Sequence, residues 1–220
     1  MKKVLHCIFS LFITIIATQS LQAQIQKNTQ MVGGSIGYNS QKNDQNYLGN
    51  TQGNEIRTFA IMPSYGKAVR KNLIVGADLN YQNTLSKNYN NSSSTETKSN
   101  EFGVGVFARH YKELGKSGFY LFLQSRLGVD ISRAKSSPSG NNNIKGFYIG
   151  AGLNPGIAYA IVPKVHIETG LNNLFYAGYS KTKSSNADPS YTSKSNGFNA
   201  GVGLGNSTEF TVGVKFFFGT

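Results

Sequence analysis

The sequence predicts an all-β fold, an eight-stranded antiparallel transmembrane up-and-down β-barrel with short periplasmic turns and long external loops. Three observations lead to this prediction. Eight segments alternate with period 2 between apolar residues and small or polar residues. The connections between these segments alternate strictly between short and long. One face of each segment is aliphatic or aromatic, and the other carries glycine, serine, asparagine and isolated charges.

The N-terminal segment has the layout of a secretory signal and is not expected to belong to the fold. Lys2 and Lys3 form a basic start, residues 4–17 are mostly apolar, and residues 18–24 are polar and small. The apolar run is shorter than the roughly 20 residues that a membrane-spanning helix needs. We therefore expect a signal peptide over residues 1–23, an outer-membrane β-barrel domain over residues 24–220, and export to the bacterial outer membrane.

Cysteine chemistry is not expected in the exported chain. Cys7, the one cysteine of the sequence, lies early in the apolar run of the predicted signal. It follows Leu5 and His6 rather than small residues, which argues against a lipid anchor. Removal of the signal leaves no thiol for a disulfide, a metal site or catalysis.

The first four predicted strands each have an apolar face that is suited to lipid. Their apolar faces are Val32, Gly34, Ile36 and Tyr38; Phe59, Ile61, Pro63 and Tyr65; Leu73, Val75, Ala77, Leu79 and Tyr81; and Phe102, Val104, Val106 and Ala108. The opposite faces are rich in glycine and polar residues, which suits the cramped interior of an eight-stranded barrel.

The last four predicted strands follow the same pattern. Their apolar faces are Phe119, Leu121, Leu123, Leu127, Val129 and Ile131; Phe147, Ile149, Ala151, Leu153, Ile157 and Tyr159; Val165, Ile167, Thr169 and Leu171; and Phe210, Val212, Val214, Phe216 and Phe218. Residues 198–204 also alternate, and two interpretations are open for them. They either extend the last strand outward, which we favour, or form a ninth strand, which would give an odd count.

The connections separate a membrane barrel from a soluble sandwich, which would also alternate. Tight turns are predicted at residues 70–72, 115–118 and 162–164. The other connections are predicted to be long polar loops, at about residues 40–54, 83–99, 134–143 and 180–196. Closure into a barrel also removes the strand edges that lipid does not tolerate.

The final strand, residues 210–218, supports a resemblance to a known family. Together with the signal peptide and the alternating strands, it is similar to the small outer-membrane β-barrel family, the OmpA/OmpX-like transmembrane barrels also called porin family. The resemblance implies that Phe210, Phe216 and Phe218 belong to an assembly signal read by the barrel-assembly machinery. The chain departs slightly from the pattern because Gly219 and Thr220 follow the last aromatic residue. The resemblance concerns fold and location more than role.

Charged residues on the predicted lumen face are the best candidate site. They are Asp78, Glu101, Arg109, Arg126, Asp130, Glu168 and Lys215. We expect Asp78 to pair with Arg109 on the next strand, and Glu168 to lie near Lys215. Buried charges must be paired to be tolerated, so an ion-pair network that fills the lumen is the favoured interpretation. A gate that opens a narrow water path is the alternative.

Catalytic, metal and cofactor sites are not predicted. The pair His166 and Glu168 sits beside a predicted periplasmic turn and points inward, far from the outer leaflet where a lipid-modifying enzyme would act. Two histidines on separate strands, His110 and His166, are too few for a zinc site. The glycine repeats at residues 103–105 and 201–205 precede no helix, so we interpret them as lumen glycines that make room for larger neighbours.

The formal charge of +12 is spread over turns and loops rather than clustered, so nucleic acid is not an expected partner. Outer-membrane lipid and lipopolysaccharide are the expected partners, and the surface partner is unknown. Candidate phosphate contacts are Lys87, Lys98, Arg133, Lys135, Lys181, Lys183 and Lys194. Candidate loop contacts are Tyr47, Tyr89, Tyr191, residues 90–94, residues 141–143 and residues 184–191. Tyrosines expected at the lipid–water boundary are Tyr38, Tyr65, Tyr81, Tyr159 and Tyr179.

Three functions follow from these patterns. The favoured one is a non-enzymatic outer-membrane barrel with a filled lumen, which serves envelope structure or surface interaction. The alternative is a narrow porin-like channel for ions or very small solutes. A lipid A-modifying enzyme is third.

Overall fold

The computed structural model describes residues 25–47, 50–137, 142–185, 192–202 and 209–219. The predicted signal peptide and Cys7 lie outside these residues. The described chain is built from ten strands, and their bounds are β1 (Gln30–Tyr47), β2 (Asn50–Arg70), β3 (Leu73–Asn90), β4 (Ser93–Glu113), β5 (Phe119–Ser137), β6 (Asn142–Val162), β7 (Val165–Asn172), β8 (Phe175–Ser185), β9 (Thr192–Val202) and β10 (Glu209–Phe218).

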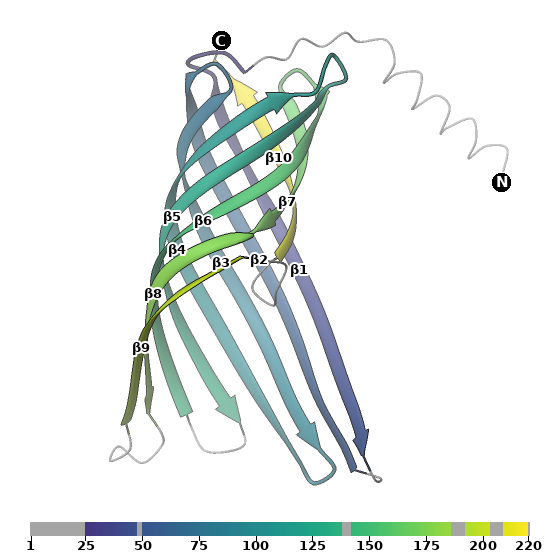
Figure 1. Cartoon of the computed structure of the whole chain (residues 1–220), viewed down its shortest axis with the longest axis vertical. Coiled ribbons are helices and arrows are strands. Elements are labelled where there is room, and N and C mark those ends of the chain that lie inside the picture. Colours follow the sequence, from purple (N-terminus) through teal and green to yellow (C-terminus); the bar gives the residue numbers. More distant parts are fainter. Residues whose placement is uncertain (1–24, 48–49, 138–141, 186–191, 203–208, 220) are drawn as a thin grey trace, which may run out of the picture.

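Eight of these strands close into an antiparallel ring, as the sequence predicts. The ring runs in the order β1, β2, β3, β4, β5, β6, β7 and β10, and β10 pairs back onto β1 with Gln30 opposite Phe218. The start of β1 and the end of β10 therefore lie at the same end of the barrel (Figure 1). Within the described residues, no helix has the length and apolar character to cross a membrane.

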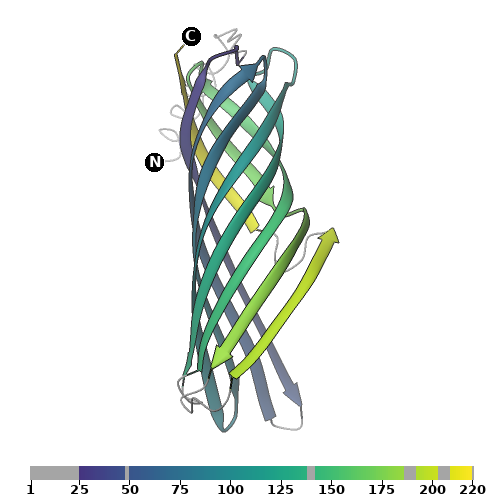
Figure 2. The ribbon, with the colours of Figure 1, turned by 90° about the vertical axis from the view of Figure 1, so that its left-hand side faces the viewer.

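β8 and β9 lie outside the ring. β6 pairs with β7 through Gly156–Val162 and with β8 through Asn143–Leu153, so it changes partner along its length. Asn173 lies between β7 and β8 with a positive φ of 57°, which interrupts the extended backbone there. β9 pairs with β8, and the two form a hairpin that branches away from β10 (Figure 2).

The expectation that residues 198–204 extend the last strand is wrong for the part that is described. Residues 198–202 belong to β9, whose partner is β8, whereas β10 pairs with β1 and β7. The ring still holds an even number of strands because β9 is not a member of it. Within the described residues, β1 pairs with β10 only as far as Gly37, so its continuation from Tyr38 has β2 as its partner.

Strands β1 to β6 are about twice as long as lipid requires. β2, β4 and β6 have 21 residues each, whereas about 9–11 residues cross a bilayer. The predicted long loops are therefore wrong as irregular segments, because most of their residues form paired strands. Their polar sequences still fit a ladder, since a hydrogen-bonded strand with water on its faces needs no apolar residues. The protruding half comprises residues 39–47, 50–58, 82–90, 93–101, 132–137, 142–146, 180–185 and 192–197.

The three tight turns are confirmed at the opposite end of the barrel. Turn residues lie at positions 71–72, 115–118 and 163–164. Asn72, Gly115 and Gly118 have positive φ values of 59°, 64° and 76°, a backbone region that glycine and asparagine tolerate best. We call the part of the ring between these turns and Asp130 the closed half.

The closed half holds the buried core inside the ring. Its members are Ile25, Met31, Ala68, Ile74, Phe107, Tyr111, Tyr120, Phe122, Ala158, Ala160 and Phe217. Ile25 precedes β1, and its carbonyl oxygen accepts a hydrogen bond from the backbone N–H of Asn72 at 3.0 Å. This contact draws the N-terminal segment across the base of the lumen.

The outside of the ring is apolar over a continuous band. Val104, Leu127 and Val212, on three different strands, are each more than half exposed. Soluble monomers rarely expose so large an apolar surface. The predicted boundary tyrosines all lie on this outer face, with Tyr65 and Tyr159 nearer the turns and Tyr38, Tyr81 and Tyr179 nearer the protruding half. The outside of the closed half is thus suited to lipid, and the buried groups lie within.

Candidate functional site: the lumen and the protruding wall

A buried carboxylate on β7 joins two buried cations inside the closed half. Glu168 Oε2 accepts a hydrogen bond from Arg109 Nη1 at 2.6 Å, and Glu168 Oε1 lies 3.3 Å from Lys215 Nζ. All three side chains are at most 7% exposed. Lys215 Nζ also donates to Ser64 Oγ at 2.9 Å. This cluster links β4, β7, β10 and β2 across the lumen.

Arg109 is held on every side by its neighbours. Its Nε donates to Gln124 Oε1 at 2.7 Å, and its Nη1 donates to the Tyr111 hydroxyl at 3.1 Å. The guanidinium also lies over the ring of Phe122, 4.5 Å from its centroid, a distance at which a cation is attracted to an aromatic face. Because the planar guanidinium must meet all of these partners at once, its position is fixed and the cluster is rigid.

A second ion pair lies nearer the protruding half. Arg126 Nε donates to Asp78 Oδ1 at 2.8 Å, and Arg126 Nη2 lies 4.0 Å from Asp130 Oδ1. Together with the first cluster, this gives three cations and three anions, so the formal charges of these six residues cancel. Balanced charge is what a low-dielectric lumen requires.

Glycines on β4 make room for this second pair. A Cβ on Gly103 would collide with the Asp130 carboxylate, and one on Gly105 would collide with the Arg126 guanidinium. Gly201 similarly leaves space for the Tyr176 ring. The interpretation of these glycines as space for larger neighbours is confirmed, except at Gly203 and Gly205, which lie outside the described residues.

The seven predicted lumen charges all lie on the inner face, but one of the two pairings predicted among them is not formed. Asp78 pairs with Arg126, and Arg109 pairs with Glu168, so the predicted pairing of Asp78 with Arg109 is wrong. The expected proximity of Glu168 and Lys215 is present. Glu101 lies on the same inner face farther up β4, beside the end of the apolar band.

Little free space remains around the two clusters. A cavity of about 40 Å³ is bordered by residues that include Asp78, Arg126 and Glu168. That volume holds a few water molecules. Two atoms of these bordering residues, Asp78 Oδ2 and Arg126 Nη2, are buried without a hydrogen-bond partner in the described residues, so they suit such waters. The closed half is therefore filled by side chains.

His166 is built into the core. It is 1% exposed and lies between Tyr120 and Phe217, with ring centroids 5.1 Å and 4.5 Å away. A histidine enclosed in this way has no open position for a substrate. Within the described residues, no group of three or more histidine, cysteine or acidic side chains is arranged to hold a metal ion.

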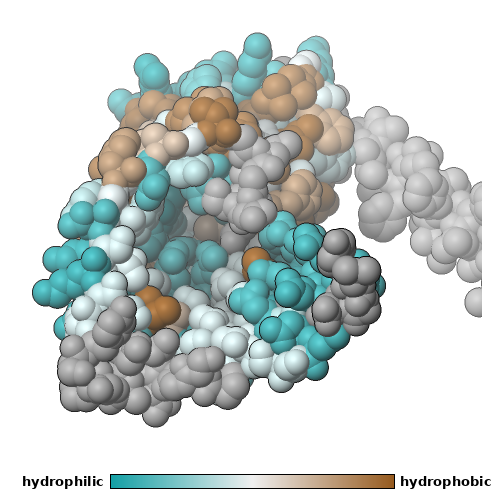
Figure 3. Space-filling model, turned by 60° about the horizontal axis from the view of Figure 1, so that its bottom comes forward, coloured by the Kyte–Doolittle hydropathy of each residue, from teal (hydrophilic) through white to brown (hydrophobic). Residues whose placement is uncertain are grey.

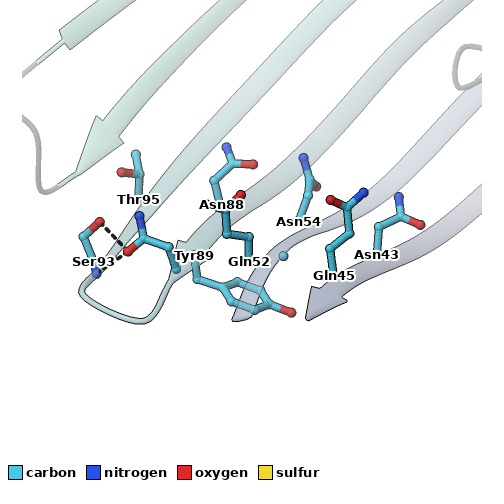
Figure 4. A pocket seen from close by; sticks show the side chains of 10 residues that line it. Asn43, Gln45, Gln52, Asn54, Asn88, Tyr89, Ser93 and Thr95 are labelled. Atoms are coloured by element: carbon cyan, nitrogen blue, oxygen red, sulfur yellow. Dashed lines mark hydrogen bonds between the residues drawn. The ribbon is translucent and has the colours of Figure 1, made fainter. Parts of the chain in front are cut away.

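The protruding half opens into a hollow with a mostly hydrophilic wall (Figure 3). A cavity of about 440 Å³ lies against β1, β2, β3 and β4. Its inward-facing residues form two rows across these strands. Register partners place Asn43, Asn54, Asn88 and Thr95 in one row, and Gln45, Gln52, Asn90 and Ser93 in the next. These eight side chains are uncharged, and they are drawn in Figure 4.

Apart from Glu101, which lies inside at the base of the protruding half, the charges of this half point away from the hollow. Alternation along each strand places on the outer face Lys42, Asp44, Glu55, Arg57, Lys87, Glu96, Lys98, Arg133, Lys135, Lys145, Lys181, Lys183 and Lys194. All seven of the predicted phosphate contacts are in this set. Lys87 and Lys98 both pair with Glu96, at 3.3 Å and 3.0 Å. The outer face therefore carries a clear excess of positive charge.

Tyr89 also belongs to the outer face. Its ring crosses Gly53 of β2, where a Cβ would collide with it, and its hydroxyl donates to Asp44 on β1. The hydrogen bond to Asp44 raises the pKa of Tyr89, while the hydrogen bond from Lys42 lowers the pKa of Asp44. Nothing is described for the side chain of Tyr47 or for Tyr191, the two other predicted loop tyrosines.

The inner rows of amides are the feature that the sequence analysis missed. They were assigned to loops, and yet a signal is present: uncharged and charged residues alternate with period 2. Gln41 to Asn46 and Thr95 to Ser99 both show it, as do residues 132–136, 180–184 and 193–195. Such alternation indicates strands whose two faces differ in charge rather than in hydropathy.

These features define the class of fold as that of the outer-membrane β-barrel proteins. The structure is similar to the crystal structure of the outer membrane protein OprG from Pseudomonas aeruginosa, at 9% identity and a TM-score of 0.53, over 91% of this chain and 100% of that one. It also matches Neisserial surface protein A (NspA), at 19% identity and a TM-score of 0.42, over 87% of this chain and 100% of that one. No protein-family model and no curated protein matches the sequence. The likeness to OprG concerns the fold alone.

Proposed function

We propose that the protein is a non-enzymatic component of the bacterial outer membrane with a sealed lumen, which interacts at the cell surface through its protruding half. The termini and the three tight turns face the periplasm in this proposal, and the hairpins face the outside. The apolar band between the two sets of boundary tyrosines supports this placement, because aromatic girdles flank the lipid core in barrels of this kind.

One observation supports the proposal that the lumen is sealed. The Arg109–Glu168–Lys215 cluster and its aromatic neighbours fill the closed half, leaving a cavity of about 40 Å³ beside them. A water-filled channel needs a continuous path, and an eight-stranded ring has room for little more than side chains. The narrow-channel alternative would require these buried pairs to separate.

The test is single-channel conductance of the refolded mature chain in a planar lipid bilayer. We expect a silent bilayer, with folding verified by heat-modifiable mobility on a gel. Glu168→Ala is expected to stay silent as well, since the buried aromatic side chains of the closed half, among them Tyr111, Tyr120 and Phe217, still fill the lumen. Reproducible conductance steps in the parent chain that change in this variant would overturn the proposal and make the channel the primary function.

The outer face supports a further part of the proposal, namely contact with lipopolysaccharide. Arg133, Lys135 and Lys145 lie on the outer face of β5 and β6 just beyond the apolar band, where anionic headgroups would sit. Attraction of cations to an anionic membrane surface favours this arrangement.

Phe210, Phe216 and Phe218 all face outward on β10, which leaves them accessible to the assembly machinery that the proposal assigns to this strand.

A further inference from the structure

The inner wall of the protruding half has a chemistry that is distinct from the rest of the barrel. Its cavity of about 440 Å³ falls in the size range of about 300–1,000 Å³ that is common for small-ligand sites. The two rows cross four strands, which at about 4.8 Å between neighbours makes a surface about 14 Å wide. The wall is thus large enough for several linked rings of a small polar ligand.

The amides of this wall are free to bind a ligand. Within the described residues, the side chains of Asn43, Gln45, Gln52, Asn54 and Asn88 make no hydrogen bond to other protein groups, while Asn90 accepts from the backbone N–H of Ser93 at 2.7 Å. Each amide offers both a donor and an acceptor. In Figure 4 the labelled amide side chains, such as Asn43, Asn54 and Asn88, project from one side of the sheet, and the Tyr89 ring lies on the other side.

The lining excludes most classes of ligand. An anionic ligand would need a lysine or arginine in the wall, and those of the protruding strands point outward. An apolar ligand would need aliphatic or aromatic lining, and none of the ten lining residues is aliphatic. Tyr89 borders the cavity but lies over Gly53 on the other face. A peptide that adds a strand to a sheet would need a free edge, whereas β2 and β3 are paired on both sides, and the edge that β1 offers beyond Gly37 lies beside the wall rather than on its inner face.

We propose that this wall is a binding site for a neutral oligosaccharide. Sugar hydroxyls are donors and acceptors at once, so adjacent hydroxyls match the two functions of each amide. Two rows at the spacing of alternate strand residues allow an extended glycan to contact several amides together. The inference rests on the proposed function, because it needs the hairpins to be exposed at the cell surface.

The test uses the mature chain refolded in detergent and polymer-bound trisaccharides as probes. The neutral probes are maltotriose, cellotriose, mannotriose and tri-N-acetylchitotriose, and the acidic ones are sialyllactose and trigalacturonate. Multivalent display is used because hydrogen bonds alone give weak single sites, which gain from avidity. We expect binding of at least one neutral probe and none of the acidic probes.

Two matched double variants locate the site. Asn54→Ala with Asn88→Ala removes two register partners from the wall, and we expect at least a tenfold loss of affinity. Asn83→Ala with Asn100→Ala removes two register partners from the outer face, and affinity should stay within twofold. If the first variant does not fold, Asn54→Asp replaces it, since a carboxylate loses the amide donor while keeping its shape.

The inference is overturned if no neutral probe binds, if the acidic probes bind better, or if both double variants lose affinity equally. These outcomes leave the proposed function untouched as long as the bilayer stays silent. Conductance steps would instead remove the proposed function, whatever the glycan result.

Discussion

Strands β1 to β6 run through both halves of the lumen, but the two halves have opposite charge layouts. On β5, Arg126 and Asp130 point inward in the closed half, whereas Arg133 and Lys135 point outward in the protruding half. β3 does the same with Asp78 and Lys87. The free space differs accordingly, with cavities of about 40 Å³ and 440 Å³.

The surrounding medium explains this reversal. Against lipid, a charge on the outer face is costly, so charged residues of the closed half are tolerated inside the ring and in pairs. Beyond lipid, water reaches both faces, and outward charges keep the hairpins soluble and apart. The same period-2 strand can therefore carry charge on either face, and its surroundings determine which one.

The largest effect on stability is expected from removal of the Glu168 carboxylate, which Arg109 and Lys215 share in the closed half. Glu168→Ala leaves Arg109 and Lys215 buried without their common partner. Breaking a buried ion pair in this way costs about 3–5 kcal/mol, and we expect the free energy of unfolding in urea to fall by that amount. Glu96→Ala is the control, because it removes only exposed pairs; a fall of equal size in the control would contradict the comparison.

A smaller effect is expected from filling the space beside the second ion pair. Gly103→Ala places a Cβ against the Asp130 carboxylate, and overpacking of this kind costs about 1–3 kcal/mol. Gly197→Ala on β9 is the matched control, since a Cβ there meets nothing within 4 Å. Urea unfolding of both variants measures the difference. Equal stability of the two would show that the lumen at Gly103 is loosely packed.

The smallest effect is expected in the wall of amides. Asn54→Ala with Asn88→Ala removes side chains that make no hydrogen bond to described protein groups, so the free energy of unfolding should change by less than about 0.5 kcal/mol per substitution, as for surface positions without special contacts. The thermal unfolding midpoint in detergent checks this. A large loss would mean that the wall contributes to folding rather than to binding.

The sequence predicts the ring well wherever hydropathy alternates. Phe102, Val104 and Val106 mark β4 because lipid on one side and a small lumen on the other impose opposite demands on neighbouring residues. The same reasoning fails for residues 83–99, where both faces meet water and hydropathy carries no period. There the strands are visible only in the alternation of charge.

The partners of the lumen charges were harder to predict than their faces. Alternation places Arg109 and Glu168 inside, but they lie on β4 and β7, which are not neighbours in the ring. They meet across the lumen, and this depends on ring diameter and stagger rather than on strand order. Reasoning from adjacent strands therefore gave Asp78 the wrong partner.

The pairing of the first strand with the last also has a consequence for the kinetics of folding. Gly37 lies opposite Thr211, so the contact that closes the ring joins residues from nearly opposite ends of the chain. Contacts between residues so far apart in sequence form slowly, because the intervening chain loses conformational entropy before the contact energy is gained. Until residues 211–218 dock, β1 and β7 both present open edges to their surroundings. We therefore expect closure to be the slow step, and the step at which unassembled chains would aggregate.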